Sequence, residues 1–298
     1  MKRIAALAAA VALAGALGGC GGVKAGDGDL IDDWAMMAAA KVPEPAVGTC
    51  WTTDATEVGK VDPGTNVTQT TCDLTHVFET VKVGHLTGSV AGAGTPPALG
   101  DLTDAWADCD KAAADYLGAE WQGGRIYLMV SPPTSKQWKG DARFYRCDVG
   151  AVRSEKGVFE PRKETMKGTL ASGGDLKLTC GTQVGVTPDS WDDITPGRCT
   201  DPHDVEYVGS VSSSTSDYPA DGKAVDAAFS KPCESKMLSY IGMSRGSWAN
   251  QKALFYGYWM TADTKSEWTA GNHTARCYAM VDKKKINRSL KGAGDITV

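Results

Sequence analysis

Two histidine–glutamate pairs are the candidate chemical groups that recur in this sequence. His76 with Glu79 and His203 with Glu206 each follow a cysteine with the spacing Cys-x3-His-x2-Glu. An imidazole and a carboxylate can act as acid and base or bind a metal ion. In a strand entered just after the histidine, however, two side chains three residues apart point to opposite faces. We therefore expect each histidine to bond backbone groups at the corner and each glutamate to face solvent, with ligand binding by the histidine as the alternative.

Other motifs for catalysis or metal binding are absent from the sequence. The closest cysteines are 19 residues apart, whereas structural zinc sites and disulfide-exchange enzymes use pairs such as Cys-x-x-Cys. The sequence also has no Gly-Lys-Ser/Thr phosphate loop and no Gly-x-Ser-x-Gly elbow. We expect no catalytic residue, no metal and no cofactor. The alternative is a surface enzyme acting on envelope material through the His/Glu residues.

Tryptophans are the other candidate binding residues. Trp138 and Trp268 lie at matching positions, each shortly before a cysteine. We expect both to pack against the neighbouring disulfide. If they were exposed in a cleft, their flat apolar surface could bind glycan or a partner protein at a low entropic cost.

The N-terminus carries an export signal. Residues 1–19 combine Lys2 and Arg3 with an apolar run that is too short to span a membrane. Leu17-Gly18-Gly19-Cys20 resembles the lipobox of bacterial lipoproteins, in which a diacylglyceryl group is attached to the cysteine. We expect a palmitate-type lipid on Cys20 that anchors the chain to the extracytoplasmic face of the cell membrane, the alternative being an ordinary secretory signal.

The charge of the chain limits its partners. The net charge is −5 and becomes −7 once Lys2 and Arg3 are removed. An acidic chain without a basic run is a poor partner for nucleic acid or for an anionic membrane surface. We expect no nucleic acid partner and membrane attachment through the lipid alone.

The remaining cysteines form two sets of four, separated by 22, 37 and 38 residues in the first set and by 19, 34 and 44 in the second. An even set in an exported chain predicts disulfides. These cysteines are Cys50, Cys72, Cys109, Cys147, Cys180, Cys199, Cys233 and Cys277.

Other residues repeat with the cysteines. Cys109-x6-Tyr116 returns as Cys233-x6-Tyr240, and Gly168-Thr169-Leu170 has an echo in Arg288-Ser289-Leu290. Self-similarity of this kind indicates a repeated unit. We expect a tether over residues 20–43, in which residues 29–41 could form a short docked helix, and two homologous domains over residues 44–174 and 175–298.

Each repeat combines a helix with strands. Apolar residues at three- and four-residue steps, followed by glycine, predict helices over 99–118 and 222–242, and Pro232 should make the second helix kink or start anew. Each unit should run strand, strand, helix, strand, strand, which gives an α+β fold of a small antiparallel sheet with one packed helix. The segments rich in β-branched and aromatic residues are 76–83, 125–130, 142–152, 205–211, 254–261 and 274–281.

The positions of the cysteines favour one disulfide pairing. The third cysteine of each set lies on the helix and the fourth in a late strand, so a disulfide between them would join helix to sheet. We expect Cys50–Cys72, Cys109–Cys147, Cys180–Cys199 and Cys233–Cys277, although four cysteines permit three pairings and the sequence leaves them open.

The combined pattern resembles the septum-formation family domain of actinobacteria. It comprises Gly48-Thr49-Cys50-Trp51, the Cys/His/Glu spacing, the Cys-x6-Tyr helix and Trp138 before Cys147. Cys-x2-Pro-His-x2-Glu is typical of that family, and residues 199–206 fit it, while the first repeat has Thr75 in place of the proline.

The resemblance covers both repeats and implies an exported or membrane-attached protein linked to the division septum or envelope, without naming a reaction. We therefore expect a non-catalytic binding or scaffold module whose partner is an envelope protein or a cell-wall polymer.

Overall fold

The computed structural model describes residues 41–171, 173–187 and 191–295. The expected signal peptide, the lipid attachment site at Cys20 and the possible helix at 29–41 lie outside these residues, apart from Lys41. Within the described part, no helix has the length and apolar character needed to cross a membrane. We call residues 41–174 the N-terminal half and residues 175–295 the C-terminal half.

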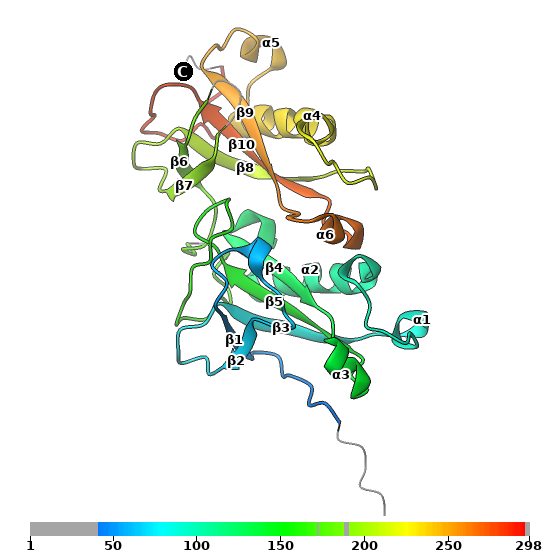
Figure 1. Ribbon diagram of the computed structural model, residues 1–298. Coiled ribbons are helices and arrows are strands. Elements are labelled where there is room, and N and C mark those ends of the chain that lie inside the picture. The colour runs from blue at the N-terminus through cyan, green and yellow to red at the C-terminus, as the bar shows by residue number, and fades with distance from the viewer. Residues whose placement is uncertain (1–40, 172, 188–190, 296–298) are drawn as a thin grey trace, which may run out of the picture. The chain divides into compact units, whose positions relative to one another are not determined.

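The N-terminal half contains a five-stranded antiparallel sheet in the order β2-β1-β3-β5-β4 (Figure 1). The long strands β3 and β5 lie side by side near its middle, and short strands occupy the edge formed by β1 and β2. The strands are β1 (Cys50–Thr53), β2 (Val67–Thr70), β3 (Phe78–His85), β4 (Ile126–Ser131) and β5 (Phe144–Ala151).

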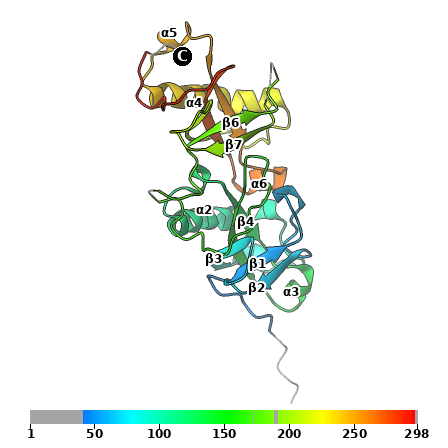
Figure 2. The same ribbon diagram turned by 90° about the vertical axis from the view of Figure 1, so that its left-hand side faces the viewer.

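The C-terminal half contains a second five-stranded antiparallel sheet in the order β7-β6-β8-β10-β9. In both sheets the first two strands along the chain form one edge, which Figure 2 shows for β1 and β2 and for β6 and β7. The strands are β6 (Cys180–Val184), β7 (Asp193–Gly197), β8 (Val205–Ser212), β9 (Leu254–Met260) and β10 (Thr274–Val281).

The α+β class with antiparallel sheets is confirmed, but each half has one strand more than expected. Three strands, not two, precede the main helix. The extra strands are only four or five residues long, and β7 contains Pro196 and Gly197, which are rare inside strands. Pairing with their neighbours, rather than local propensity, makes these segments strands.

One long helix packs against each sheet. Helix α2 (Thr103–Leu117) contacts β3, β4 and β5, and α4 (Gly222–Ile241) contacts β8, β9 and β10. Both end at a glycine in the left-handed region, Gly118 with φ of 86° and Gly242 with φ of 77°, a conformation that costs glycine little. The expected new start at Pro232 is wrong, because α4 runs through it.

The shorter helices lie in the connections, some between two strands and others between a strand and a long helix. The α-helices are α1 (Gly88–Ala91), α3 (Ser135–Lys139), α5 (Arg245–Trp248) and α6 (Lys265–Ala270). The 3-10 helices are η1 (Val58–Lys60), η2 (Leu99–Asp101) and η3 (Trp121–Gly123).

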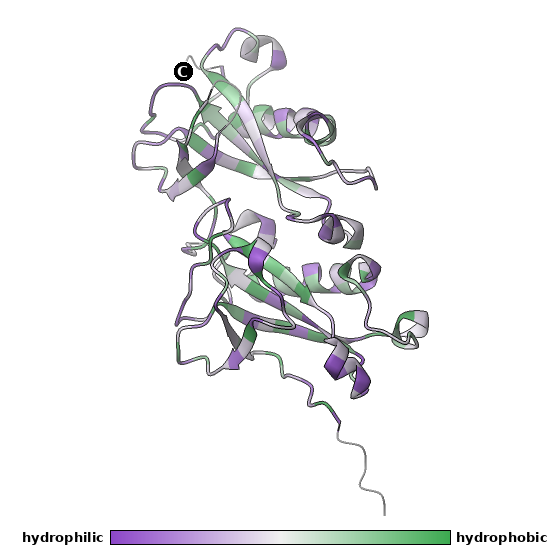
Figure 3. Ribbon diagram, in the orientation of Figure 1, coloured by the Kyte–Doolittle hydropathy of each residue, from purple (hydrophilic) through white to green (hydrophobic). Residues whose placement is uncertain are grey.

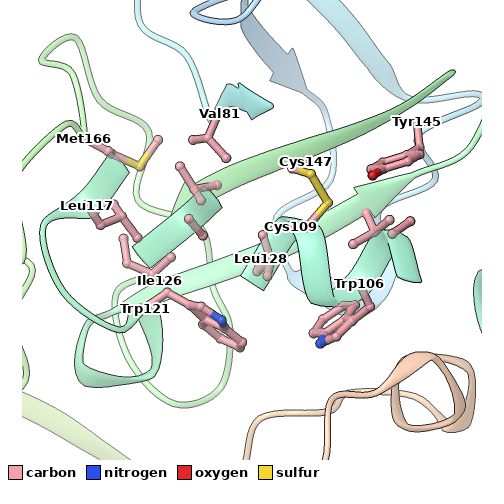
Figure 4. Close-up of a cluster of buried hydrophobic side chains, with 14 of the residues drawn as sticks. Val81, Trp106, Cys109, Leu117, Trp121, Ile126, Leu128, Tyr145, Cys147 and Met166 are labelled. Atoms are coloured by element: carbon pink, nitrogen blue, oxygen red, sulfur yellow. A yellow bond between two sulfur atoms is a disulfide. The ribbon is translucent and has the colours of Figure 1, made fainter. Parts of the chain in front are cut away.

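One hydrophobic cluster in each half lies between its long helix and its sheet, and a second cluster contains no residue of that helix. In the N-terminal half Trp106, Cys109 and Leu117 of α2 meet Ile126 and Leu128 of β4, all nearly inaccessible to solvent (Figure 4). Burial of one such aliphatic side chain stabilises a fold by about 1.5–3 kcal/mol. Figure 3 shows the same division, with hydrophobic residues gathered on the central strands and hydrophilic ones on the connections.

The four disulfides have the expected pairing. Cys109–Cys147 joins α2 to β5 and Cys233–Cys277 joins α4 to β10, and all four of these residues are fully buried. On the chain-entropy model, loops of these lengths stabilise a fold by about 3–4 kcal/mol each.

The other two disulfides join one buried and one accessible cysteine. The buried partners, Cys50 and Cys180, begin β1 and β6. The outer partners differ in degree, since Cys72 is exposed and Cys199 is partly exposed. We call Cys50 and Cys180 the inner cysteines.

Candidate functional site

Each histidine of the repeated pattern touches the glutamate three residues later. His76 Nε2 lies 3.0 Å from Glu79 Oε1, and His203 Nε2 lies 3.0 Å from Glu206 Oε1. The four residues are at most 2% exposed.

The expectations that the side chains would point to opposite faces and that the glutamates would face solvent are therefore wrong. The alternation of a regular strand does not extend back to either histidine, because His76 precedes β3 and His203 precedes β8. Each histidine makes its own isolated bridge instead, to Arg162 and to Ile286 respectively.

Glu79 fastens three distant segments of the N-terminal half to one another. Besides His76, its carboxylate accepts hydrogen bonds from the Tyr116 hydroxyl at 2.6 Å, the Thr165 hydroxyl at 3.1 Å and the Met166 backbone N–H at 3.0 Å. Tyr116 belongs to α2, while residues 165 and 166 lie in the loop after β5. We call this carboxylate and its donors the carboxylate hub.

Glu206 makes the corresponding bonds in the C-terminal half. It accepts from the Tyr240 hydroxyl at 2.8 Å, the Ser289 hydroxyl at 2.8 Å and the Leu290 backbone N–H at 2.7 Å, in addition to His203. Hydrogen bonds to a buried charged group are worth about 1.5–3 kcal/mol each. The His-x2-Glu spacing and the Cys-x6-Tyr helix therefore belong to one internal network.

These bonds also correct the sequence echo proposed for the end of each repeat. Thr165-Met166, not Thr169-Leu170, is the counterpart of Ser289-Leu290, since each pair supplies a hydroxyl and an N–H to its hub. The register continues in the next residues, where the N–H groups of Gly168 and Gly292 donate to the Tyr116 and Tyr240 carbonyls at 2.9 Å. Glycine and leucine recur in both loops, so composition alone aligned them four residues out of register.

Both ring nitrogens of each hub histidine have an oxygen partner. As expected, the second ring nitrogen faces the backbone, with His76 Nδ1 2.9 Å from the Leu74 carbonyl and His203 Nδ1 2.7 Å from the Asp201 carbonyl. Each ring is therefore held between a backbone carbonyl and the glutamate of its hub, which fixes its orientation.

The tyrosines of the two hubs are neutral donors. Burial raises the pKa of Tyr116 to about 12, with a further increase from its hydrogen bond to Glu79. Burial likewise raises the pKa of Tyr240 to about 12. Neither hydroxyl ionises near neutral pH, so both tyrosines remain hydrogen-bond donors to their glutamates over the physiological range.

An inner cysteine lies beside each hub. Ligand atoms of Cys50, His76 and Glu79 all fall within 4.8 Å of one another, and Cys180, His203 and Glu206 do the same. The sulfurs are held in disulfides and so are not the thiolates that bind metal ions. In the oxidised protein, the contacts of the buried hubs are therefore those of a structural hydrogen-bond network that connects separate segments of the fold.

The tryptophans at matching positions are both buried. Trp138 is 4% exposed and donates to the Ala93 carbonyl, while Trp268 is fully buried and donates to the Ser216 carbonyl. The tryptophans that cluster with Cys109 and Cys147 are different ones, Trp106 and Trp121.

A polar cavity of about 350 Å³ lies between the two halves. Trp106 is among the lining residues, and most of the others carry hydroxyl, amide or carboxylate groups, without lysine, arginine or histidine. Sequence reasoning missed it because no single segment contains it. The polar lining residues are Thr103, Asp110, Glu120, Gln122, Ser210, Ser212 and Thr274.

Comparison with known proteins gives one family. Residues 47–277 match the family described as septum formation, a span that begins before β1, includes both His/Glu pairs and ends within β10. No curated protein and no solved structure matches the chain.

Proposed function

The chain belongs to the septum-formation family, and from this membership we propose that it is a lipid-anchored lipoprotein of the actinobacterial cell envelope. In this proposal Cys20 carries the lipid, and the folded part acts outside the cytoplasmic membrane as a non-catalytic binding or scaffold module in septum formation. The two halves are tandem copies of one unit, a proposal supported by their common strand order and disulfide pattern.

The observation that carries the non-catalytic role is the closed geometry of the hubs. A general acid or base must reach its substrate within hydrogen-bonding distance. Glu79 and Glu206 are at most 2% exposed, and each already accepts four internal donors. Residues so deeply bonded support the fold rather than a reaction.

The polar cavity is the place at which we expect an envelope ligand to bind. Its volume falls in the range of small-ligand sites, and its carboxylates disfavour an anion. Hydroxyl, amide and carboxylate groups beside the Trp106 ring suit a neutral, hydroxyl-rich ligand such as a sugar unit of a wall polymer.

A binding assay on full-length protein tests this function. We expect the purified chain to bind cell-wall material, and Glu120→Lys at the cavity to weaken binding at least tenfold. Glu164→Lys is the matched control, since it makes the same charge change at an exposed residue outside the cavity lining. Equal binding by both variants would remove the cavity from the proposal, and failure of the unmodified chain to bind wall or any envelope protein would contradict the module itself.

The alternative function is a surface enzyme that acts on envelope material through its His/Glu residues. Assay of His203→Ala against wall substrates separates the two functions. Loss of a measurable activity in a variant that remains folded would support the enzyme.

A further inference from the structure

We propose that reduction of the Cys50–Cys72 and Cys180–Cys199 disulfides turns each carboxylate hub into a binding site for a divalent transition metal such as Zn²⁺. The ligands are the sulfur of the inner cysteine, Nε2 of the histidine and Oε1 of the glutamate. Reduction thereby creates two sites in one chain, one in each half.

The ligand atoms are already close to the required positions. Within each trio they lie no more than 4.8 Å apart, and ligands about 2.0–2.3 Å from a common zinc ion would be separated by somewhat less than this. Thiolate, imidazole and carboxylate are the three ligand types that zinc uses in proteins. Once Cys50 is released from Cys72, a small rotation of its side chain would bring the sulfur into place.

Both hubs supply the outer contacts that orient metal ligands. A metal-bound histidine usually donates its other ring N–H to a carbonyl or carboxylate, and His76 Nδ1 and His203 Nδ1 face backbone carbonyls at 2.9 and 2.7 Å. The second glutamate oxygen accepts a tyrosine hydroxyl in each half, at 2.6 Å from Tyr116 and 2.8 Å from Tyr240. These contacts hold the histidine and the glutamate in place while the metal enters.

The accessible outer cysteine makes the disulfide reducible by a small dithiol. A thiolate of the dithiol attacks the sulfur of Cys72 or Cys199, the disulfide breaks, and the inner sulfur leaves as a thiolate beside the histidine. The second thiol of the reductant then displaces the outer cysteine. The net products are two protein thiols and the cyclic disulfide of the reductant, with two electrons and two protons transferred.

The other two disulfides are internal controls. Cys109–Cys147 and Cys233–Cys277 are fully buried, and among the described residues neither belongs to a group that could hold a metal. Any metal bound by the reduced chain through the proposed sites should therefore depend on Cys50 and Cys180 alone.

Two matched double variants of the full-length chain test the proposal without any reductant. Cys72→Ser with Cys199→Ser leaves both inner cysteines free, whereas Cys50→Ser with Cys180→Ser loses the same two disulfides but frees the outer thiols instead, and Cys20 is the same in both variants. We titrate each with Co²⁺, whose thiolate charge-transfer absorption reports a sulfur ligand, and follow folding by circular dichroism. The first should bind two Co²⁺ per chain and the second none, and addition of Glu206→Gln should reduce the first to one.

Wild-type protein provides the second measurement in case a variant fails to fold. After mild reduction by dithiothreitol and its anaerobic removal, two Co²⁺ per chain should bind with thiolate absorption, and excess Zn²⁺ should displace them. Equal binding by the two double variants, binding without thiolate absorption, or no binding by reduced folded protein would overturn the proposal.

Discussion

One arginine has the same place in both halves of the molecule and different partners. Arg146 and Arg276 each precede the last cysteine of their set. Arg146 pairs with Asp148 of its own strand and lies 3.7 Å over the Trp51 ring. Arg276 instead crosses to the N-terminal half, where it pairs with Glu155 at 2.7 Å.

The neighbouring residues explain the difference. The residue two positions after the arginine is Asp148 in the first half and Tyr278 in the second, and Gly181 replaces Trp51. Without a carboxylate in its own strand, the Arg276 guanidinium also donates to the carbonyls of Gln122, Gly124 and Ile126.

The comparison separates two kinds of residue. The hubs and disulfides have equivalent contacts in both halves, as expected of groups that hold a fold together. The arginine position is free to change its partners, and in the C-terminal half it joins the two halves. Contacts without an equivalent in the other half, such as that of Arg276, therefore distinguish the complete chain from a single repeat.

Removal of a hub carboxylate should have the largest effect. Glu79→Ala or Glu206→Ala leaves the buried histidine and a backbone N–H without their acceptor and removes the bonds from two less buried hydroxyls, and we expect a loss of more than about 5 kcal/mol in the free energy of unfolding. Urea denaturation measures it. We expect similar losses for the two variants. A small loss in only one of them would contradict the claim that the two hubs stabilise their halves equally.

Loss of the arginine between the halves should rank second. Arg276→Met leaves Glu155 buried without its cation and should cost about 3–5 kcal/mol. Calorimetry should then show the transitions of the two halves moving apart, because the buried ion pair between them is lost while other contacts, such as the Tyr127–Glu267 hydrogen bond, remain. Arg146→Met is the matched control, and it should destabilise the N-terminal half without separating the transitions.

The pH dependence of stability should come from Glu267, whose counterpart in the first half is Gln137 of the same Thr-x-x-Gln/Glu-Trp pattern. Burial raises the pKa of Glu267 to about 7, from a usual value of 4.5. Between these values the folded carboxyl keeps its proton and the unfolded one does not, so stability should fall as pH rises from 4.5 to 7, by up to about 3 kcal/mol.

Glu267→Gln copies the first half and should remove that part of the pH dependence. Unfolding measured in urea at several pH values checks it. The glutamine should still accept the Tyr127 hydroxyl bond that Glu267 makes at 2.9 Å. If the free energy of unfolding of Glu267→Gln depends on pH as that of the unmodified protein does, the pH dependence comes from other groups.

The smallest effect concerns Pro232 in α4, for which the first half has Asp108 at the same place before the helix cysteine. Pro232→Ala restores a backbone donor inside the helix and should stabilise the protein by about 1 kcal/mol. Thermal unfolding measures the change, and a decrease in stability would show that the proline ring makes a contact worth more than the lost hydrogen bond.

The sequence predicts the two long helices and the long strands because these depend on local patterns, and the preferred disulfide pairing, one of three that the spacing permits, is confirmed. The sequence does not predict the short strands, because segments such as 193–197 form strands only by pairing with neighbouring strands. Pro232 predicts a kink or a new start, yet α4 does not start anew there, since burial of Phe229, Cys233 and Met237 favours one continuous helix.

The candidate site could be predicted only in part. The histidines, glutamates and tyrosines of the hubs stood out by their spacing, but their mutual contact depends on a bend before the strand that alternation rules ignore. The donors at 165–166 and 289–290 are far away in the sequence and differ in residue type. The polar cavity takes its residues from both halves, so no local pattern could reveal it.

Hydrogen exchange at two amides tests most directly whether the repeated His/Glu pattern is an internal fastening. The Met166 and Leu290 N–H groups lie in loops and donate to Glu79 and Glu206. Both should exchange slowly, and Glu79→Gln should speed exchange at Met166 alone, just as Glu206→Gln should at Leu290 alone. Fast exchange at both amides in the unmodified protein would contradict the hubs.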